Sequence, residues 1–271
     1  CGPIPTNPTR MNPTARTSLN SQASGKMGIL DNVLGRLGSV TSLLKPIADL
    51  HLDATGGHMD RAAFYNALRT SQTQLFGTSL SETRVQGMEG ILNAMAEVGD
   101  NRNETLAYAL ATAYHETGAR MVPVREGFAP TDEAAIRDVA ALARKLGPNS
   151  PPARYGKPAG PYGKVYFGRG QMQLTWLENY QGCSADAGTD LVKDPDAMLD
   201  PKISARVLIR GLMDGRWNGQ HKGIAYYLPT NGQPDLKDAR RCVNGTDCWQ
   251  KIAGYYEAFL AAIKAAGGWK A

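Results

Sequence analysis

Apolar residues at helical spacing, preceded by side chains that cap helix ends, constrain the fold of this chain most. The capping positions are Ser79 with Glu82, Asn101 with Glu104, and Thr131. Serine, threonine and asparagine accept hydrogen bonds from free N–H groups at a helix start, and a glutamate three residues later completes a capping box. Gly147-Pro148 ends the third run, and helical spacing returns over 202–214 and 247–266. The sequence therefore predicts a mainly α fold with few strands.

A long segment between these runs has a different composition. Residues 148–173 are rich in proline, glycine and tyrosine and show no helical period, so they are predicted to form a long ordered loop. Loops that are held by a rigid helical scaffold often carry binding or catalytic residues. We therefore expect part of a functional site in this segment.

The first 57 residues differ from the rest of the chain. Residues 1–27 are rich in Pro, Thr, Ser, Asn and Gly, and residues 29–50 carry apolar side chains at roughly helical spacing. Gly56-Gly57 marks a boundary. We predict a flexible N-terminal segment, 1–57, with an amphipathic helix, followed by one large domain, 58–271. Residues 29–50 could dock on that domain, on a partner or on a membrane surface.

Composition limits the classes of partner. A formal charge of +5 favours anionic partners such as nucleic acid, membrane surfaces or bacterial wall polymers. The basic residues are scattered and match no nucleic-acid module, so nucleic acid is not expected. No apolar run is long enough to span a bilayer, and no signal-peptide pattern is present. We expect Met11 to be the natural start.

The cysteines and histidines do not form a metal-binding pattern. Cys1, Cys183, Cys242 and Cys248 have no zinc-ligand spacing, and the four histidines are scattered. We expect neither a metal nor another cofactor. Cys242 and Cys248 flank a short turn, and the sequence leaves open whether they form a disulfide or stay reduced.

Two glutamates are the strongest candidates for chemistry. Glu116 closes an apolar helical run in Tyr-His-Glu-Thr-Gly, and Glu126 follows Arg125 in the next loop. Burial and the helix C-terminus would both favour the protonated form of Glu116, as a general acid requires. An arginine near Glu126 would keep that carboxylate ionised, as a general base requires. Taken alone, Glu116 is equally compatible with a solvated glutamate at a helix end, and an Arg-Glu sequence such as Arg125-Glu126 more commonly forms a surface ion pair.

Four motifs, two of which contain these glutamates, favour a catalytic role for them. They are His115-Glu116-Thr117-Gly118, Arg125-Glu126-Gly127, Tyr166-Phe167-Gly168-Arg169-Gly170-Gln171-Met172-Gln173-Leu174-Thr175 and Val243-Asn244-Gly245. Their order resembles that in glycoside hydrolase family 19, which contains plant-type chitinases and phage endolysins, over about residues 58–268. The short gap between the glutamates is similar to that of the endolysin branch. The chain has too few cysteines for the disulfides of the plant enzymes.

The resemblance implies roles for individual residues. Glu116 matches the general acid and Glu126 the general base of an inverting mechanism, in which the carboxyl groups lie roughly 6.5–9.5 Å apart. Gln173, Thr175, Asn179 and Asn244 match positions that line the substrate cleft. Among the neighbouring aromatics, Tyr114 and Tyr166 are candidates for stacking on sugar rings, with core packing as the alternative. Arg169 is expected to hold the loop or a carboxylate rather than substrate.

The resemblance also implies a fold and a biological setting. The fold would be a lysozyme-like, two-lobed helical domain with a deep substrate cleft. The expected function is hydrolysis of the β-1,4 glycan strands of bacterial peptidoglycan, by an enzyme made in the host cytoplasm that acts on the periplasmic wall. Residues 29–50 would add contact with an anionic envelope or membrane surface. The alternatives are a chitinase and a non-catalytic virion protein that binds the wall.

Overall fold

The computed structural model describes residues 58–70, 75–218 and 220–270. The predicted mainly α fold is confirmed within these ranges, since helices dominate and the two strands are two residues long each. None of the described helices is long and apolar enough to cross a membrane. The flexible segment 1–57 and its amphipathic helix over 29–50 lie outside the described residues, so the domain boundary stays a prediction.

The chain forms long helices separated by short helical turns. The longer helices are α3 (Arg61–Thr70), α4 (Glu82–Val98), α5 (Asn103–Glu116), α6 (Asp132–Leu146), α8 (Leu177–Ala187), α9 (Pro201–Asp214) and α12 (Trp249–Ala265). The short elements are β1 (Val124–Arg125), η1 (Glu126–Phe128), α7 (Pro151–Tyr155), β2 (Arg169–Gly170), η2 (Pro195–Leu199), α10 (Ile224–Tyr227), α11 (Leu236–Ala239) and η3 (Arg240–Cys242). The predicted helices over 202–214 and 247–266 correspond closely to α9 and α12.

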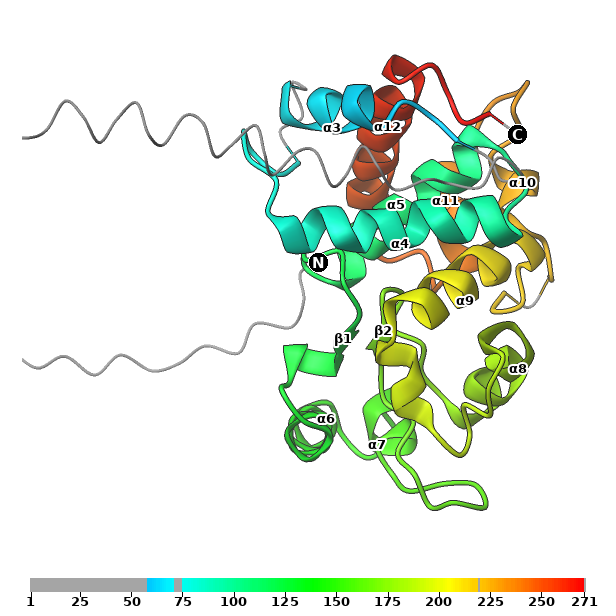
Figure 1. Ribbon diagram of the computed structural model, residues 1–271. Coiled ribbons are helices and arrows are strands. Elements are labelled where there is room, and N and C mark those ends of the chain that lie inside the picture. Colours follow the sequence, from blue (N-terminus) through cyan, green and yellow to red (C-terminus); the bar gives the residue numbers. More distant parts are fainter. Residues whose placement is uncertain (1–57, 71–74, 219, 271) are drawn as a thin grey trace, which may run out of the picture. The chain divides into compact units, whose positions relative to one another are not determined.

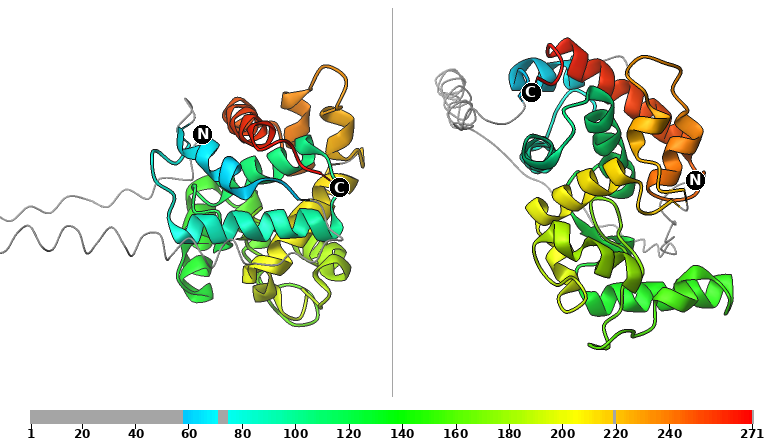
Figure 2. Two further views of the ribbon diagram at one scale, coloured as in Figure 1. Left: turned by 45° about the horizontal axis from the view of Figure 1, so that its top comes forward. Right: turned by 90° about the vertical axis from the view of Figure 1, so that its right-hand side faces the viewer.

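Helix α5 is the centre of the larger hydrophobic core. Residues 105–113 are all buried, as expected of a helix that is covered on every side. Helices α4 and α12 both pack on α5, and α12 also packs on α3. Figures 1 and 2 show these four helices on one side of the β1–β2 pair and α6, α7 and α8 on the other. Glu116 is the last residue of α5, so the core fixes the base of its side chain.

A second, smaller core lies beneath α6. It contains Ala135 and Val139 from α6 with Val165 and Phe167 from the segment before β2. This separate apolar cluster gives α6 a buried face, formed by Ala135 and Val139, while its other residues are partly or fully exposed. The described residues therefore have two apolar centres, one on α5 and one on α6.

Helix ends follow the predicted residue types but not always the predicted positions. Thr131 caps α6 by accepting a hydrogen bond from Ala134 N, as predicted, and Gly147 ends that helix. The cap of α4 is Ser81, which accepts from Arg84 N, so the predicted start at Ser79 is two residues too early. The predicted cap Asn101 is also wrong, because α5 begins after Arg102 without a side-chain cap.

The segment 148–173 contains more regular secondary structure than the predicted ordered loop. It contains helix α7 and strand β2, and β2 pairs antiparallel with β1 through Val124 with Gly170 and Arg125 with Arg169. Both elements are too short to produce a readable period in the sequence.

The Gln171 side chain connects this pair to the main core. Its Nε2 atom donates to Met121 O at 2.6 Å and to Gly87 O at 3.2 Å, while its backbone N donates to Ser204 Oγ at 2.8 Å. One buried residue thus joins α4 and the turn that leads into β1 through its side chain, and α9 through its backbone N–H.

Gly87 in α4 allows the close approach on which this connection depends. A Cβ atom at Gly87 would lie 2.4 Å from the backbone oxygen of Met121, whereas one at Gly90 would meet only Pro201 O at 3.8 Å. We expect Gly87→Ala to lower the free energy of unfolding by about 1–3 kcal/mol through overpacking. Gly90→Ala, one turn away in the same helix, should raise the free energy of unfolding by about 0.5–1 kcal/mol because alanine favours helix. Urea unfolding of both variants measures the difference, and equal effects would contradict the described packing.

Candidate active site

Glu116 ends α5 beside a buried arginine. Its Oε1 atom lies 2.9 Å from Nη2 of Arg240, and its side chain is 16% exposed. Burial raises the pKa of Glu116, and the Arg240 cation opposes that rise while Asp247 adds to it. Burial and Arg240 also lower the pKa of the adjacent His115 to about 4, so His115 is neutral at neutral pH. Glu116 is therefore an acid whose proton is retained at higher pH than usual.

Arg240 was not identified from the sequence. It precedes the Asn244 motif by four residues and lies in η3, where the Nε and Nη1 atoms have no hydrogen-bond partner among the described residues. Its backbone oxygen accepts from the N–H groups of Val243 and Asn244. Arg240 therefore joins Glu116 to the turn that carries Asn244.

Glu126 is held by two donors from the predicted loop segment. Oε1 accepts from the Tyr155 hydroxyl at 2.6 Å, and Oε2 accepts from Gly168 N at 2.9 Å. The Glu126 backbone N donates to Gly168 O at 2.7 Å. Burial and the nearby Glu126 raise the pKa of Tyr155, so its hydroxyl keeps the proton that it donates. These two donors fix the orientation of the Glu126 carboxylate and leave lone pairs for a water molecule.

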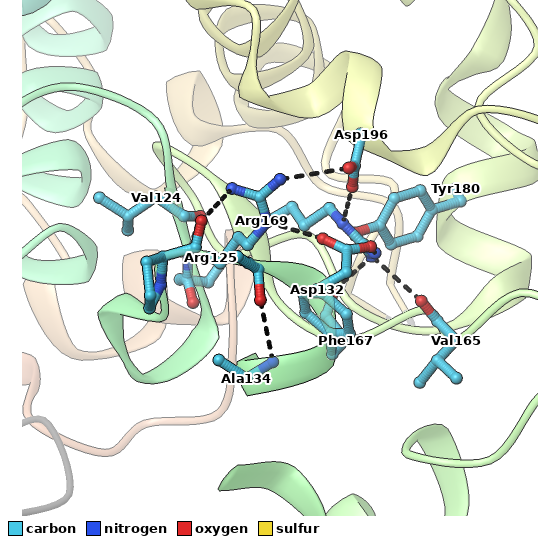
Figure 3. A network of polar contacts seen from close by, with 12 residues as sticks. Val124, Arg125, Asp132, Ala134, Val165, Phe167, Arg169, Tyr180 and Asp196 are labelled. Atoms are coloured by element: carbon cyan, nitrogen blue, oxygen red, sulfur yellow. Dashed lines mark hydrogen bonds and ion pairs between the residues drawn. The ribbon is translucent and has the colours of Figure 1, made fainter. Parts of the chain in front are cut away.

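The neighbouring Arg125 does not pair with Glu126, which corrects the interpretation of the Arg-Glu sequence. Its guanidinium donates to Asp132 at 2.6 Å and to Asp196 at 3.2 Å. Arg169 donates to the same two carboxylates, at 2.6 Å to Asp132 and 2.7 Å to Asp196 (Figure 3). Two arginines and two aspartates thus alternate in a closed ring. Glu126 is stabilised by neutral donors instead.

The buried arginine of this ring has the supporting role that was expected. Arg169 is 1% exposed, and its Nη1 atom donates to Val165 O at 3.1 Å. Its guanidinium also stacks on the Phe167 ring at 3.6 Å from the centroid. Burial raises the pKa of Asp132, but hydrogen bonds from Arg125 and Arg169 outweigh it and leave that pKa below the usual range. The ring therefore stays charged and joins β1, β2, α6 and η2.

The segments that follow the two glutamates touch. A Cβ atom at Gly118, two residues after Glu116, would lie 3.0 Å from the Phe128 ring, two residues after Glu126. Gly118 has a φ of 56°, a conformation that glycine adopts at low cost. The predicted deep cleft and the predicted carboxyl separation stay predictions.

Three of the predicted cleft residues form a chain of hydrogen bonds next to Glu126. Gln173 Nε2 donates to Val124 O at 3.0 Å, and a Cβ atom at Gly168 would lie 2.8 Å from Gln173 Oε1 and 3.4 Å from Glu126 Oε2. Thr175 Oγ1 donates to Gln173 O, and Asn179 Nδ2 donates to Thr175 O. The structure thus places Gln173 next to Glu126, and Thr175 and then Asn179 follow Gln173 in the hydrogen-bonded chain.

The predicted aromatic and asparagine positions differ in exposure. Tyr166 is 1% exposed and its hydroxyl donates to Val192 O, so its ring fits the alternative of core packing and offers no face to a sugar. Tyr114 is partly buried against Phe76 and Tyr255, with its hydroxyl bonded to Leu75 O. Asn244 is exposed and its Oδ1 accepts from Gly245 N.

Neither a disulfide nor a metal-binding cluster is found among the described residues. Cys183, Cys242 and Cys248 are free thiols, so Cys242 and Cys248 are not bonded to each other. No group of three or more His, Cys, Asp or Glu side chains among the described residues is arranged to hold a metal ion.

The matching family model and the similar proteins all bear chitinase names. Residues 91–218 match the family model for class I chitinases of glycoside hydrolase family 19. Endochitinase 1 of Theobroma cacao is 56% identical over 43 residues, which are 16% of this chain and 13% of that protein. The acidic endochitinase of Dioscorea japonica is 33% identical over 112 residues, 39% of this chain and 42% of that protein. The chain therefore spans less than half the length of these relatives.

Solved structures include similar chains at low identity. Chitinase C from Streptomyces griseus HUT6037 is 20% identical with a TM-score of 0.45, covering 78% of this chain and 77% of that one. A bacterial family 19 chitinase is 21% identical with a TM-score of 0.40, covering 78% and 97%.

The Glu116–Arg240 pair predicts a measurable shift in acidity. Arg240→Met should raise the pKa of Glu116 further, because the cation that favours the carboxylate is removed while burial and Asp247 remain. Carbon-13 NMR titration of the Glu116 carboxyl measures this pKa. Arg241→Met is the control, because Arg241 is exposed and pairs with Asp238. An unchanged or lowered pKa in Arg240→Met would contradict the described ion pair.

Proposed function

Because residues 91–218 match the model of glycoside hydrolase family 19 chitinases, we propose that the chain hydrolyses β-1,4-linked glycans with Glu116 as general acid and Glu126 as general base. The observation that carries this proposal is the contrast between the two carboxylates. Glu116 is buried at a helix end with a raised pKa, while Glu126 accepts hydrogen bonds from two neutral donors. Burial favours the proton that a general acid must donate, and the two donors fix the orientation of the carboxylate that a general base uses toward water.

In this mechanism Glu116 protonates the oxygen of the leaving sugar. Arg240 fixes the orientation of the carboxyl through Oε1, so Oε2 is the atom that would carry the proton to the glycosidic oxygen. After transfer, the Arg240 cation stabilises the carboxylate that remains. Arg240 is thus a positioning residue that limits the rise in pKa caused by burial.

Glu126 acts in the same step by removing a proton from water. Tyr155 and Gly168 hold one oxygen each, so the plane of the carboxylate is defined before the water arrives. We expect Gln173 Oε1, which lies beside Glu126, to orient that water. Attack from the face opposite the leaving group inverts the anomeric carbon and requires carboxyl groups roughly 6.5–9.5 Å apart. Thr175, Asn179, Asn244 and Tyr114 are the proposed substrate contacts; Tyr166 keeps only a packing role.

We propose bacterial peptidoglycan as the substrate, so that the enzyme is of the endolysin type. The ten-position spacing of Glu116 and Glu126 resembles that of the endolysin branch, and the net charge of +5 favours an anionic wall and envelope. The setting proposed with it is synthesis in the host cytoplasm and action on the periplasmic wall. Residues 29–50 would then supply contact with the anionic envelope or membrane surface.

Chitin is the second candidate substrate. Relatives that match part of the chain are named endochitinases, and the same two glutamates would cleave β-1,4-linked N-acetylglucosamine polymers. A virion protein without activity would have no need for the acid and base, and both are present with their hydrogen-bonding partners.

The two substrates are distinguished by one pair of assays. We expect the protein to clear suspensions of Gram-negative cells whose outer membrane has been permeabilised, and to release little soluble product from chitooligosaccharides.

Glu116→Gln should lower this lytic activity roughly 10²–10⁴-fold, because the amide cannot donate the proton. Glu178→Gln is the matched control, because Glu178 is exposed on α8. Chitooligosaccharide cleavage without lysis would replace peptidoglycan by chitin, and normal activity of Glu116→Gln would refute the acid assignment.

A further inference from the structure

A cavity lies beside the segment that carries Glu126 and is not used by the proposed acid–base step. Its volume is about 290 Å³, and its lining includes Arg120, Pro123, Arg125, Phe128, Pro130 and Leu199. Arg125 and Phe128 stand on either side of Glu126 in the sequence. The cavity therefore borders the loop that carries Glu126. The Glu126 side chain itself is hydrogen-bonded to Tyr155 and Gly168.

Arg120 presents a positively charged group at this cavity. Its guanidinium stacks on the Phe128 ring, 3.9 Å from the centroid, and Nη1 donates to Thr117 O at 3.3 Å. The residue is exposed, and Nη1 is the guanidinium atom that is hydrogen-bonded among the described residues, which leaves Nε and Nη2 free to donate. A guanidinium that is held flat by a ring, with free N–H groups, is suited to bind a carboxylate through two parallel hydrogen bonds.

Arg120 is the lining arginine whose charge is not paired with a carboxylate among the described residues. Asp132 and Asp196 pair with both Arg125 and Arg169, so these two carboxylates balance those two arginines. Arg125 is thus held by its two carboxylates, while Arg120 keeps free donors.

We propose that this cavity binds a carboxylate of an acidic peptide attached to the glycan strand. The inference rests on the proposed peptidoglycan substrate and deepens it, because the stem peptides of peptidoglycan carry carboxylates and chitin carries none. The prolines and Leu199 offer apolar contact to the peptide chain. Four extended residues span up to about 13–14 Å, so a stem peptide could reach a cavity beside the catalytic loop from a sugar in the cleft.

The test compares one protein on two forms of the same substrate. The quantity measured is kcat/KM on peptide-bearing glycan strands divided by kcat/KM on the same strands after an amidase has removed the peptides. We expect this ratio to fall roughly tenfold in Arg120→Gln, as loss of one charge-assisted contact implies, chiefly through KM. Arg120→Glu should lower it further because the charge is reversed. Arg144→Gln, an exposed arginine near the end of α6, removes the same charge elsewhere and should leave the ratio unchanged.

Each outcome decides the inference. A ratio in Arg120→Gln equal to that of the wild type would overturn the carboxylate site and leave the proposed function standing. The same fall in Arg144→Gln would also overturn it, because net charge rather than the cavity would then be responsible. If the wild type cleaves neither form of the strands but cleaves chitooligosaccharides, the peptidoglycan proposal fails and this inference fails with it. Far-ultraviolet circular dichroism shows that each variant is folded.

Discussion

The pairing of Arg169 with two carboxylates is the interaction on which the placement of Glu126 depends. Arg169 lies in β2, Asp132 begins α6 and Asp196 lies in η2, and Arg125 in β1 completes the ring. A buried guanidinium without partners would be strongly destabilising, because a charge loses its hydration on burial. The four elements must therefore come together for Arg169 to be buried. Once they do, the antiparallel pairing of β1 with β2 sets the position of Glu126 next to Gly168.

The catalytic proposal follows from a difference between the two sides of this framework. Glu116 stands at the end of a helix whose residues 105–113 are buried, with Arg240 paired to it and Asp247 close enough to raise its pKa. Glu126 stands at the end of a two-residue strand, where a hydroxyl and a backbone N–H face it. The same side-chain type thus stands in two different environments, and burial raises the pKa of Glu116. Arg125, the obvious partner of Glu126 in the sequence, is used by the charge ring instead.

The sequence predicts the long helices well because each buries one or more apolar stripes. The spacing over 202–214 and the cap at Thr131 agree with the structure, whereas the caps at Ser79 and Asn101 do not. Neighbouring Ser, Asn and Asp residues can cap a helix equally well, so local sequence cannot choose among them.

The partners of the two glutamates could not be predicted in the same way. Arg240 lies 124 positions after Glu116, and Tyr155 lies 29 positions after Glu126 in a segment that was predicted to be loop. Contacts of this kind leave no periodic signal and are set by tertiary packing. Tyr166 illustrates the converse, since its aromatic side chain beside glycines is compatible with stacking on sugar until its 1% exposure is known. The one available signal for Arg240 was its nearness to the Asn244 motif.

The anomeric configuration of the first product tests the assignment of Glu116 and Glu126 most directly. Early proton NMR spectra of a glycan digest record this configuration before mutarotation mixes the anomers. Direct attack by a water molecule that Glu126 activates predicts the α-anomer from a β-1,4 linkage. An initial β-anomer would contradict the account, because retention requires a covalent intermediate and would make Glu126 a nucleophile rather than a base.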